Sequence, residues 1–191
     1  MIRFGFDIDG TTTTNDWLLP YVNEFFGLEI KMEDVIEYDL CLATNTSPDE
    51  FGKWFIENEE RMYINPPIMA GAKEMIVKWA INNEVYFISA RGDEVMDVTE
   101  HWLKINEIPY NHLELIGTHH KIDAIKKHQI QIFFEDRHDN AVNISRECGI
   151  PCILFDAPYN RLPIPEDVTV IRCTDWQEAA EWVNEWIRNQ S

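Results

Sequence analysis

Two carboxylates stand two residues apart in the segment Asp7-Ile8-Asp9-Gly10-Thr11. The residues before them, 2–6, form a short apolar run typical of a strand buried on both faces, and Gly10 lets the chain turn into a loop. In open α/β sheets, ligands bind beyond the carboxyl ends of the strands, so both carboxylates could approach one small site. One of them could attack phosphorus as a nucleophile while the other serves as general acid and base. The alternative is an ordinary turn rich in Asp and Gly.

A hydroxyl and a guanidinium follow the apolar run 85–88, in the sequence Ser89-Ala90-Arg91. At a second strand end, these groups suit hydrogen bonding to a phosphoryl group. Ser89 could instead cap the next helix, which is a frequent role for serine. Arg91 could contact a substrate phosphate or pair with a nearby acid, and the residues alone do not choose between these roles.

Lys121 begins a short predicted helix after Gly117-Thr118-His119-His120. A lysine at that point could neutralise the charge on Asp7 and on a transferred phosphoryl group. A solvated lysine at a helix start is the alternative. His119 and His120 are adjacent on an expected loop, and no role is assigned to them.

Glu135 and Asp136 follow the apolar run 130–134, so they are expected at a third strand end. Burying a charge without a partner costs several kcal/mol, so two acids here imply a cation close by. Together with Asp7 they make an all-oxygen site, which selects Mg²⁺ or Mn²⁺ over Zn²⁺. Asp139 and Asn140 come next and could hold the loop, hold a metal-bound water or cap a helix.

The segments that position these residues alternate between strand and helix patterns. Apolar runs of strand length occur at residues 2–6, 85–88, 130–134, 152–155 and 168–171. Apolar residues repeat at helical spacing within residues 72–80, 95–103, 141–148 and 179–187. Strands that alternate with helices predict an α/β fold with a parallel sheet covered on both faces.

One region interrupts the alternation. Residues 17–69 carry helical patterns and many aromatic residues but no convincing buried strand, and Pro66-Pro67 marks the exit. This region is predicted to be a helical cap inserted after the first strand. The α/β core domain is then expected to comprise residues 1–16 and 70–191.

Composition restricts the partners of the chain. The 191 residues are 45% hydrophobic, enough for a sizeable core, and 16 Lys and Arg oppose 34 Asp and Glu for a formal charge of -18. Nucleic-acid polymers and anionic membranes require clustered positive charge, so neither is expected as a partner. A small anionic substrate requires a metal ion or a few cations to reverse the local field.

The location is expected to be cytoplasmic. The N-terminus lacks the pattern of a signal peptide, and no apolar stretch approaches the length of a membrane span. The four cysteines match no zinc-ligand spacing and are predicted to be reduced, buried thiols.

Taken together, these motifs resemble those of the haloacid dehalogenase-like hydrolase superfamily. Its DxDGT motif matches residues 7–11, the serine of its second motif Ser89, the lysine of its third Lys121, and its acidic fourth motif Glu135-Asp136. The resemblance covers the whole chain and implies a three-layer, Rossmann-like core. Within the superfamily the chain is similar to 5'(3')-deoxyribonucleotidases and related bacterial nucleotidases. That similarity is carried by Ile8-Asp9-Gly10-Thr11, by Tyr38-Asp39-Leu40 and by Phe155-Asp156-Ala157-Pro158-Tyr159-Asn160.

The resemblance implies a mechanism with an aspartyl-phosphate intermediate. Asp7 is then the nucleophile and Asp9 the general acid and base. Mg²⁺ is expected to be bound by Asp7, by the backbone carbonyl of Asp9 and by Asp136. The phosphoryl group is expected on Ser89, Ala90, Lys121, Gly10 and Thr11. Glu135 stands where such nucleotidases often have aspartate, which leaves its role open.

The same resemblance implies a small phosphomonoester as substrate, with a nucleoside 5'-monophosphate as the leading candidate. A sugar phosphate and a non-catalytic binding module are the alternatives, and a homodimer is left open. The cap is expected to close over the site and read the leaving group. Phe26, Trp54 or Phe55 could stack on a nucleobase or could simply pack the cap.

Overall fold

A six-stranded parallel sheet forms the centre of the computed structural model, which describes residues 1–189. The strand order is β3-β2-β1-β4-β5-β6, so the two edge strands are β3 and β6. The strands are β1 (Arg3–Phe6), β2 (Glu84–Ser89), β3 (His112–Leu115), β4 (Ile132–Glu135), β5 (Cys152–Phe155) and β6 (Val170–Cys173). The predicted parallel α/β fold is confirmed.

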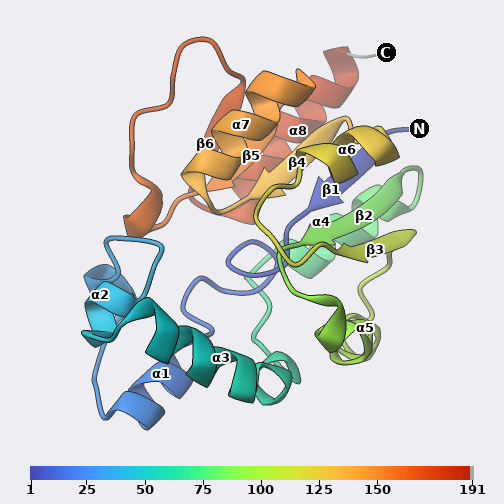
Figure 1. The fold of residues 1–191 in the computed structure, drawn as a ribbon. Coiled ribbons are helices and arrows are strands. Elements are labelled where there is room, and N and C mark those ends of the chain that lie inside the picture. The colour runs from blue at the N-terminus through green and yellow to red at the C-terminus, as the bar shows by residue number, and fades with distance from the viewer. Residues whose placement is uncertain (190–191) are drawn as a thin grey trace.

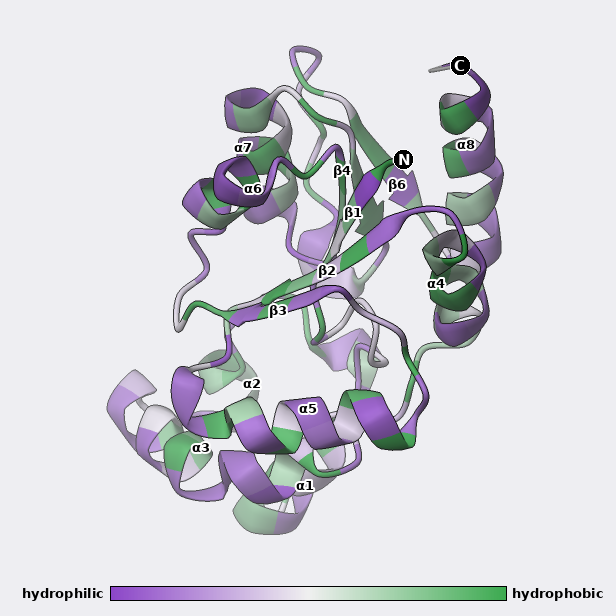
Figure 2. Cartoon of the chain, turned by 90° about the vertical axis from the view of Figure 1, so that its right-hand side faces the viewer, coloured by the Kyte–Doolittle hydropathy of each residue, from purple (hydrophilic) through white to green (hydrophobic). Residues whose placement is uncertain are grey.

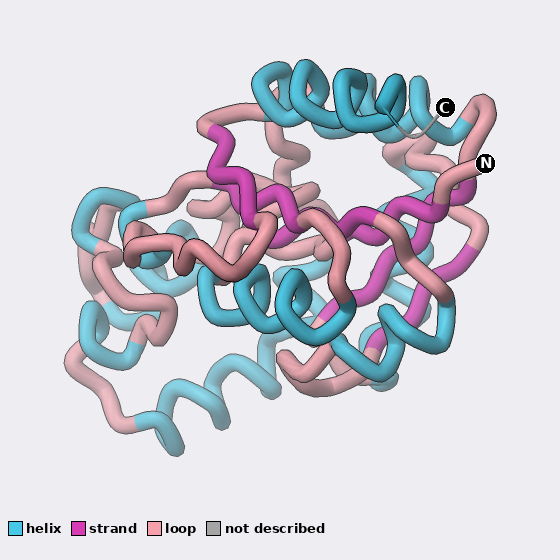
Figure 3. The backbone as a smooth tube through the Cα atoms, turned by 90° about the horizontal axis from the view of Figure 1, so that it is seen from above, coloured by secondary structure: helices cyan, strands magenta, loops and turns pink. Residues whose placement is uncertain are grey.

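Helices cover both faces of this sheet, as Figures 1 and 2 show. One face carries α4 (Ala72–Ala80) and α8 (Trp176–Asn189), and the other carries α6 (Ile122–His128) and α7 (His138–Cys148). The view from above in Figure 3 shows the twisted strands between these helical layers. A further helix, α5 (Met96–Ile105), contacts α3 (Pro48–Tyr63) of the inserted region. This is the three-layer arrangement that the sequence predicts.

Each face of the sheet buries its own apolar cluster. Phe4, Phe6 and Trp176 belong to the cluster under α4 and α8, whereas Phe133 belongs to the one under α6 and α7. Gly5 pairs with Phe133 across β1 and β4, and a Cβ at Gly5 would lie 2.5 Å from the Phe133 ring. Glycine is therefore required at this point because the ring occupies the place of a side chain.

The strand β3 is absent from the sequence prediction. Its residues, His-Leu-Glu-Leu, are mostly half-buried, and the strand pairs only with β2 at the edge of the sheet. Polar His112 and Glu114 alternate with its two leucines, so β3 lacks the continuous apolar run of a strand buried on both faces. The last strand also begins two residues later than predicted, at Val170, where Ile171 pairs with Ile153 of β5.

The inserted region is helical, as predicted. Its elements are α1 (Leu19–Phe26), the 3-10 helix η1 (Met32–Asp34), α2 (Cys41–Thr44) and α3 (Pro48–Tyr63). Figure 1 shows them together, beyond the carboxyl ends of β1 and β4. Two antiparallel connections link them to the core, with Thr14 N donating to Pro67 O and Met69 N to Thr12 O, both at 2.9 Å. The division into a cap of residues 17–69 and a separate core stays a prediction.

Two further short 3-10 helices lie in loops of the core, η2 (Asp93–Val95) and η3 (Pro158–Asn160). Across residues 1–189, every helix is too short or too polar to traverse a lipid bilayer.

Candidate active site

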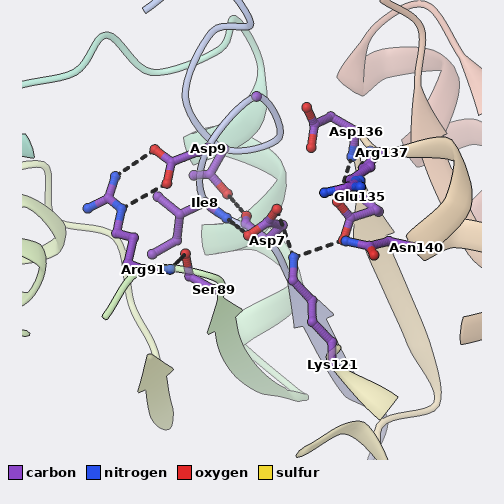
Figure 4. Close-up of polar contacts among 12 residues, drawn as sticks. Asp7, Ile8, Asp9, Ser89, Arg91, Lys121, Glu135, Asp136, Arg137 and Asn140 are labelled. Carbon is purple, nitrogen blue, oxygen red and sulfur yellow. Dashed lines mark hydrogen bonds and ion pairs between the residues drawn. The ribbon is translucent and has the colours of Figure 1, made fainter. Parts of the chain in front are cut away.

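Three neighbouring strands deliver the predicted residues to one edge of the sheet. Asp7 follows β1, Ser89 ends β2 and Glu135 ends β4. Because β2, β1 and β4 are adjacent and parallel, these positions lie side by side. Figure 4 shows their side chains gathered around Asp7.

Lys121 connects two of these strand ends. Its Nζ lies 2.8 Å from Asp7 Oδ2 and 2.8 Å from Glu135 Oε2, and its side chain is completely buried. Burial acts to lower the pKa of this ammonium, but the charges and hydrogen bonds of Asp7 and Glu135 outweigh that and raise it. Lys121 is therefore positively charged and lies directly beside the Asp7 carboxylate.

Asp7 is held rigidly between backbone and lysine. Its Oδ1 accepts a hydrogen bond from Ile8 N at 2.8 Å, and its Oδ2 faces Lys121. Burial raises the pKa of Asp7, Lys121 opposes this, and Glu135 adds to the rise. A further cation close to Asp7 would favour its ionised form.

Glu135 is fully engaged by protein groups. Oε2 binds Lys121 and accepts from Asn140 Nδ2 at 3.4 Å, while Oε1 accepts from the backbone N–H groups of Asp136 and Arg137 at 3.3 and 3.2 Å. Its role, which the sequence leaves open, is to hold Lys121 and the loop that carries Asp136.

Asp136 has one oxygen that no described residue satisfies. Oδ2 accepts from Tyr159 Oη, whereas Oδ1 is buried and lacks a hydrogen-bond partner within residues 1–189. Burial raises the pKa of this carboxyl, and the charges of Glu135 and Asp7 raise it further. A buried carboxylate oxygen without a partner is costly unless a cation binds it.

These residues fit Mg²⁺. One oxygen each of Asp7, Glu135 and Asp136 lies within 4.8 Å of the other two, and all three residues are buried. Because Glu135 is occupied by Lys121 and the loop, Asp7 and Asp136 are the side chains left to bind an ion. Hard oxygen donors of this kind suit Mg²⁺.

Gly10 keeps the first loop close to Asp136. It has a left-handed φ of 74°, and a Cβ there would lie 2.4 Å from Asp136 Oδ2. Any larger residue would therefore be strained and would displace the Asp136 carboxylate.

Arg91 pairs with Asp9. Its Nε and Nη2 donate to the two Asp9 oxygens at 2.9 and 2.8 Å, and Nη1 donates to Thr99 Oγ1 at 3.0 Å. The guanidinium is completely buried and lies 3.7 Å from the centre of the Tyr63 ring. Burial lowers the pKa of Arg91, but Asp9 outweighs this and raises it. The sequence leaves two roles open for Arg91, and in the structure Arg91 pairs with an acid, Asp9.

Ser89 does not cap a helix. The residue before η2 is Gly92, and Ser89 Oγ instead accepts from Arg91 N at 3.3 Å while the side chain lines the cavity. Ala90 and Gly10 also line the cavity. Thr11 is completely buried and does not line it, so its contact with phosphate stays a prediction.

A cavity of about 810 Å³ opens above these groups. Its floor contains Asp7, Asp9 and Asp136, and its far wall comes from the inserted region, including Tyr38 in the loop before α2 and Phe55 of α3. Of the three aromatic residues predicted to stack or pack, only Phe55 lines this cavity. Phe26 and Trp54 pack against each other and against Phe51, with the rings of Phe26 and Trp54 5.2 Å apart.

Known proteins resemble this chain in sequence and in fold. No family model matches the chain. The chain is 42% identical over 186 residues to a protein of Halalkalibacterium halodurans named "Putative nucleotidase BH1399", covering 97% of this chain and 94% of that protein. The chain belongs to the same nucleotidase family as this protein.

Solved structures of haloacid dehalogenase-like hydrolases share its fold. The protein SP0104 from Streptococcus pneumoniae superposes with a TM-score of 0.67 at 14% identity, over 95% of this chain and 98% of that one. YfnB from Bacillus subtilis, which was solved bound to magnesium, superposes with a TM-score of 0.62 at 10% identity, over 96% and 98%.

In this nucleotidase-family chain, two residues that hydrogen-bond to Asp136 were not predicted from the sequence to belong to the site. Tyr159 donates to its carboxylate, and Asn160 Nδ2 donates to its backbone carbonyl at 2.5 Å and to Phe155 O at 2.7 Å. Both residues follow β5, beside β4, and the rule that strand ends carry the site could have found them. Tyr63, which stacks on Arg91, could not be found by this rule, because it lies at the end of helix α3 and not at the end of a strand.

Proposed function

We propose that the protein is a Mg²⁺-dependent phosphomonoester hydrolase that acts through an aspartyl-phosphate on Asp7, with nucleoside 5'-monophosphates as substrates. The observation that carries the proposal is the position of Asp7, between the buried ammonium of Lys121 and Asp136, whose Oδ1 has no partner among the described residues. Asp7 and Asp136 would hold the ion, together with the backbone carbonyl of Asp9. When bound, Mg²⁺ neutralises negative charge on the carboxylates and on the phosphoryl oxygens.

In the first step, an Asp7 oxygen forms a bond to phosphorus as the bond to the leaving oxygen breaks. Asp9 gives its proton to that oxygen, so the leaving group departs as an alcohol. Lys121 and Ser89 stabilise the charge on the phosphoryl oxygens. In the second step, Asp9 takes a proton from water, the water oxygen bonds to phosphorus, and the bond to Asp7 breaks.

The pair of Arg91 and Asp9 has to loosen for this chemistry. Both Asp9 oxygens accept hydrogen bonds from Arg91, whereas the first step requires Asp9 to face the leaving oxygen and donate a proton to it. The phosphoryl group of the substrate would compete for Arg91 and so release Asp9. Arg91 then also binds substrate, which is the other role that the sequence leaves open for it.

Three observations support a nucleotide as substrate. The cavity of about 810 Å³ falls within the range of about 300–1,000 Å³ that is usual for small-molecule sites. Its cap side presents the aromatic rings of Tyr38, Phe51 and Phe55, on which a base could stack. The relative at 42% identity carries the name of a nucleotidase.

The test is release of inorganic phosphate from a panel of nucleoside monophosphates and sugar phosphates at saturating Mg²⁺. We expect kcat/KM at least about tenfold higher for a nucleoside 5'-monophosphate than for any sugar phosphate, since stacking of one base is worth about 1–3 kcal/mol. A sugar phosphate as the best substrate would remove the nucleotide from the proposal and leave the hydrolysis. No hydrolysis of any phosphomonoester would remove both.

The covalent step has its own test. With p-nitrophenyl phosphate, whose leaving group requires little protonation, Asp9→Asn should release about one equivalent of nitrophenolate in a burst and then stall, as an accumulating covalent intermediate requires. Asp7→Asn should give no burst. Steady release without a burst by Asp9→Asn, at an undiminished rate, would rule out Asp9 as the base of the second step.

The proposed cytoplasmic location is supported by the cysteines. All four are free thiols, as is usual in a reducing compartment, although Cys148 is half-buried rather than buried as predicted. Cys148 is the last residue of α7 and is partly exposed to solvent. The predicted partners are a small phosphomonoester and Mg²⁺, and a homodimer stays open.

A further inference from the structure

Two histidines and a glutamate come together at the edge of the sheet, at the end of α6 remote from Lys121. His112 and Glu114 are two residues apart on β3, so their side chains leave the same face of the strand. His128 is the last residue of α6 and reaches the same place from above that face. None of the three residues lines the catalytic cavity or takes part in the proposed hydrolysis.

The ligand atoms of this cluster are close together. One atom each of His112, Glu114 and His128 lies within 4.8 Å of the other two. His112 Nε2 is 3.4 Å from Glu114 Oε2, and His128 Nε2 contacts the same oxygen. The two imidazole rings are 4.3 Å apart between centroids.

We propose that His112, Glu114 and His128 form a binding site for a first-row transition-metal ion, with Zn²⁺ the best fit. Two imidazole nitrogens and one carboxylate oxygen are a common ligand set for Zn²⁺ and differ from the oxygen-only set beside Asp7. Ligand atoms around a tetrahedral Zn²⁺ lie roughly 3.3 Å apart, as its bond lengths of about 2.0–2.2 Å dictate. The cluster reaches that spacing with small side-chain rotations, and the fourth position is left to water.

The surroundings of the cluster favour a bound cation. All three side chains are partly covered, with exposed fractions of 39% for His112, 24% for Glu114 and 14% for His128. The ring of Tyr86 lies beside both imidazoles, 5.9 Å from His112 and 5.4 Å from His128, and restricts how far they can turn away.

Lys127 is the competitor for the ion. Its Nζ donates to both Glu114 oxygens, at 3.0 and 3.1 Å, from a side chain that is 62% exposed. An exposed lysine contributes little to stability through such a pair and can swing into solvent. Without a metal ion, Lys127 compensates the charge of Glu114, so a divalent cation on Glu114 Oε2 competes with this ion pair. The proposal therefore predicts variants that move Zn²⁺ affinity in opposite directions.

The experiment is titration of the full chain with Zn²⁺ against a chromophoric chelator, in the presence of saturating Mg²⁺ to occupy the site at Asp7 and Asp136. We expect one equivalent of Zn²⁺ to bind to the wild type. His112→Asn and His128→Asn should each weaken that binding by at least about 100-fold, more than the about 10–100-fold usual for outer-shell partners of a metal site. Lys127→Gln should strengthen it several-fold.

His101→Asn is the matched control, because His101 is an exposed histidine on α5 outside the cluster. Its Zn²⁺ affinity should equal that of the wild type, and circular dichroism should confirm that every variant is folded. Unchanged Zn²⁺ affinity in His112→Asn and His128→Asn, or no Zn²⁺ binding by the wild type in excess Mg²⁺, overturns the proposal. If a histidine variant does not fold, Lys127→Gln still decides, since unchanged or weaker Zn²⁺ binding in that variant contradicts the competition. Phosphate release is not the readout, so this result is independent of the proposed hydrolysis.

Discussion

The sheet side and the cap side of the catalytic cavity are built in opposite ways. On the sheet side, Asp7, Lys121, Glu135 and Asp136 are all buried, and almost every polar atom among them has a protein partner. On the cap side, Tyr38 is 40% exposed and Ile56 70% exposed, and the cavity wall is mostly apolar or aromatic. The sheet side therefore holds charged groups in place before any substrate arrives, whereas the cap side offers surface that can adapt to a leaving group.

This contrast predicts that substitutions on the sheet side change the rate of the chemical step, while substitutions on the cap side change which substrate binds. Binding energy used away from the reacting atoms affects KM more than kcat unless it orders the site.

The largest effect is expected from Asp7→Asn. An amide is no nucleophile toward phosphorus, so kcat should fall by about 10⁴-fold or more. Phosphate release measures the loss, and Asp139→Asn is the control, because Asp139 is a nearby exposed carboxylate that pairs with Arg137 rather than with the site. Activity of Asp7→Asn within tenfold of the wild type would show that the sheet side does not carry the chemistry.

A smaller but still large effect is expected from Lys121→Met. The variant removes the charge that stabilises the phosphoryl oxygens, so kcat should fall by about 10²–10³-fold. It also leaves Asp7 and Glu135 buried without their shared cation, which should cost about 3–5 kcal/mol of unfolding free energy. Denaturant unfolding measures the second effect.

Glu135→Gln completes a double-mutant cycle with Lys121→Met. The double variant should recover part of the lost unfolding free energy without recovering kcat, because the neutral amide introduced by Glu135→Gln no longer leaves a buried charge unpaired. Additive stability losses would mean that Lys121 and Glu135 are not coupled as their 2.8 Å contact implies.

An intermediate effect is expected from Tyr159→Phe. The variant removes the hydroxyl that donates to Asp136 Oδ2, so the Mg²⁺ concentration for half-maximal activity should rise about 10–100-fold. At saturating Mg²⁺, kcat should stay close to that of the wild type. An unchanged Mg²⁺ concentration for half-maximal activity would show that Tyr159 does not contribute to Mg²⁺ binding.

The smallest effect on catalysis is expected in the cap. Phe55→Leu removes a ring that lines the cavity, and KM for the nucleotide should rise about tenfold with little change in kcat, as base stacking is worth about 1–3 kcal/mol. Phe26→Leu, in the packed aromatic cluster of the cap, should lower thermal stability and leave KM unchanged. A large fall in kcat for Phe55→Leu would contradict the expectation that substitutions on the cap side change KM rather than kcat.

The predictions from sequence succeeded where position along the chain dictates position in space. Asp7, Ser89 and Asp136 each come directly at the end of a strand, and parallel strands bring their carboxyl ends to one edge. The buried strands were recognisable from their continuous apolar runs. The edge strand β3 was not, because its exposed side tolerates His112 and Glu114 among two leucines.

The amino-acid sequence by itself determined the parallel sheet, the helical insertion and the residue types at the strand ends, since these follow from local patterns of apolar residues. Only the tertiary structure decided the partners of the charged groups. Glu135 holds Lys121 from 14 positions away along the chain, and Arg91 holds Asp9 from 82 positions away. Such pairs form because a buried charge must be compensated by an opposite charge that the packing brings close to it. Local sequence patterns do not predict which two charged residues will meet.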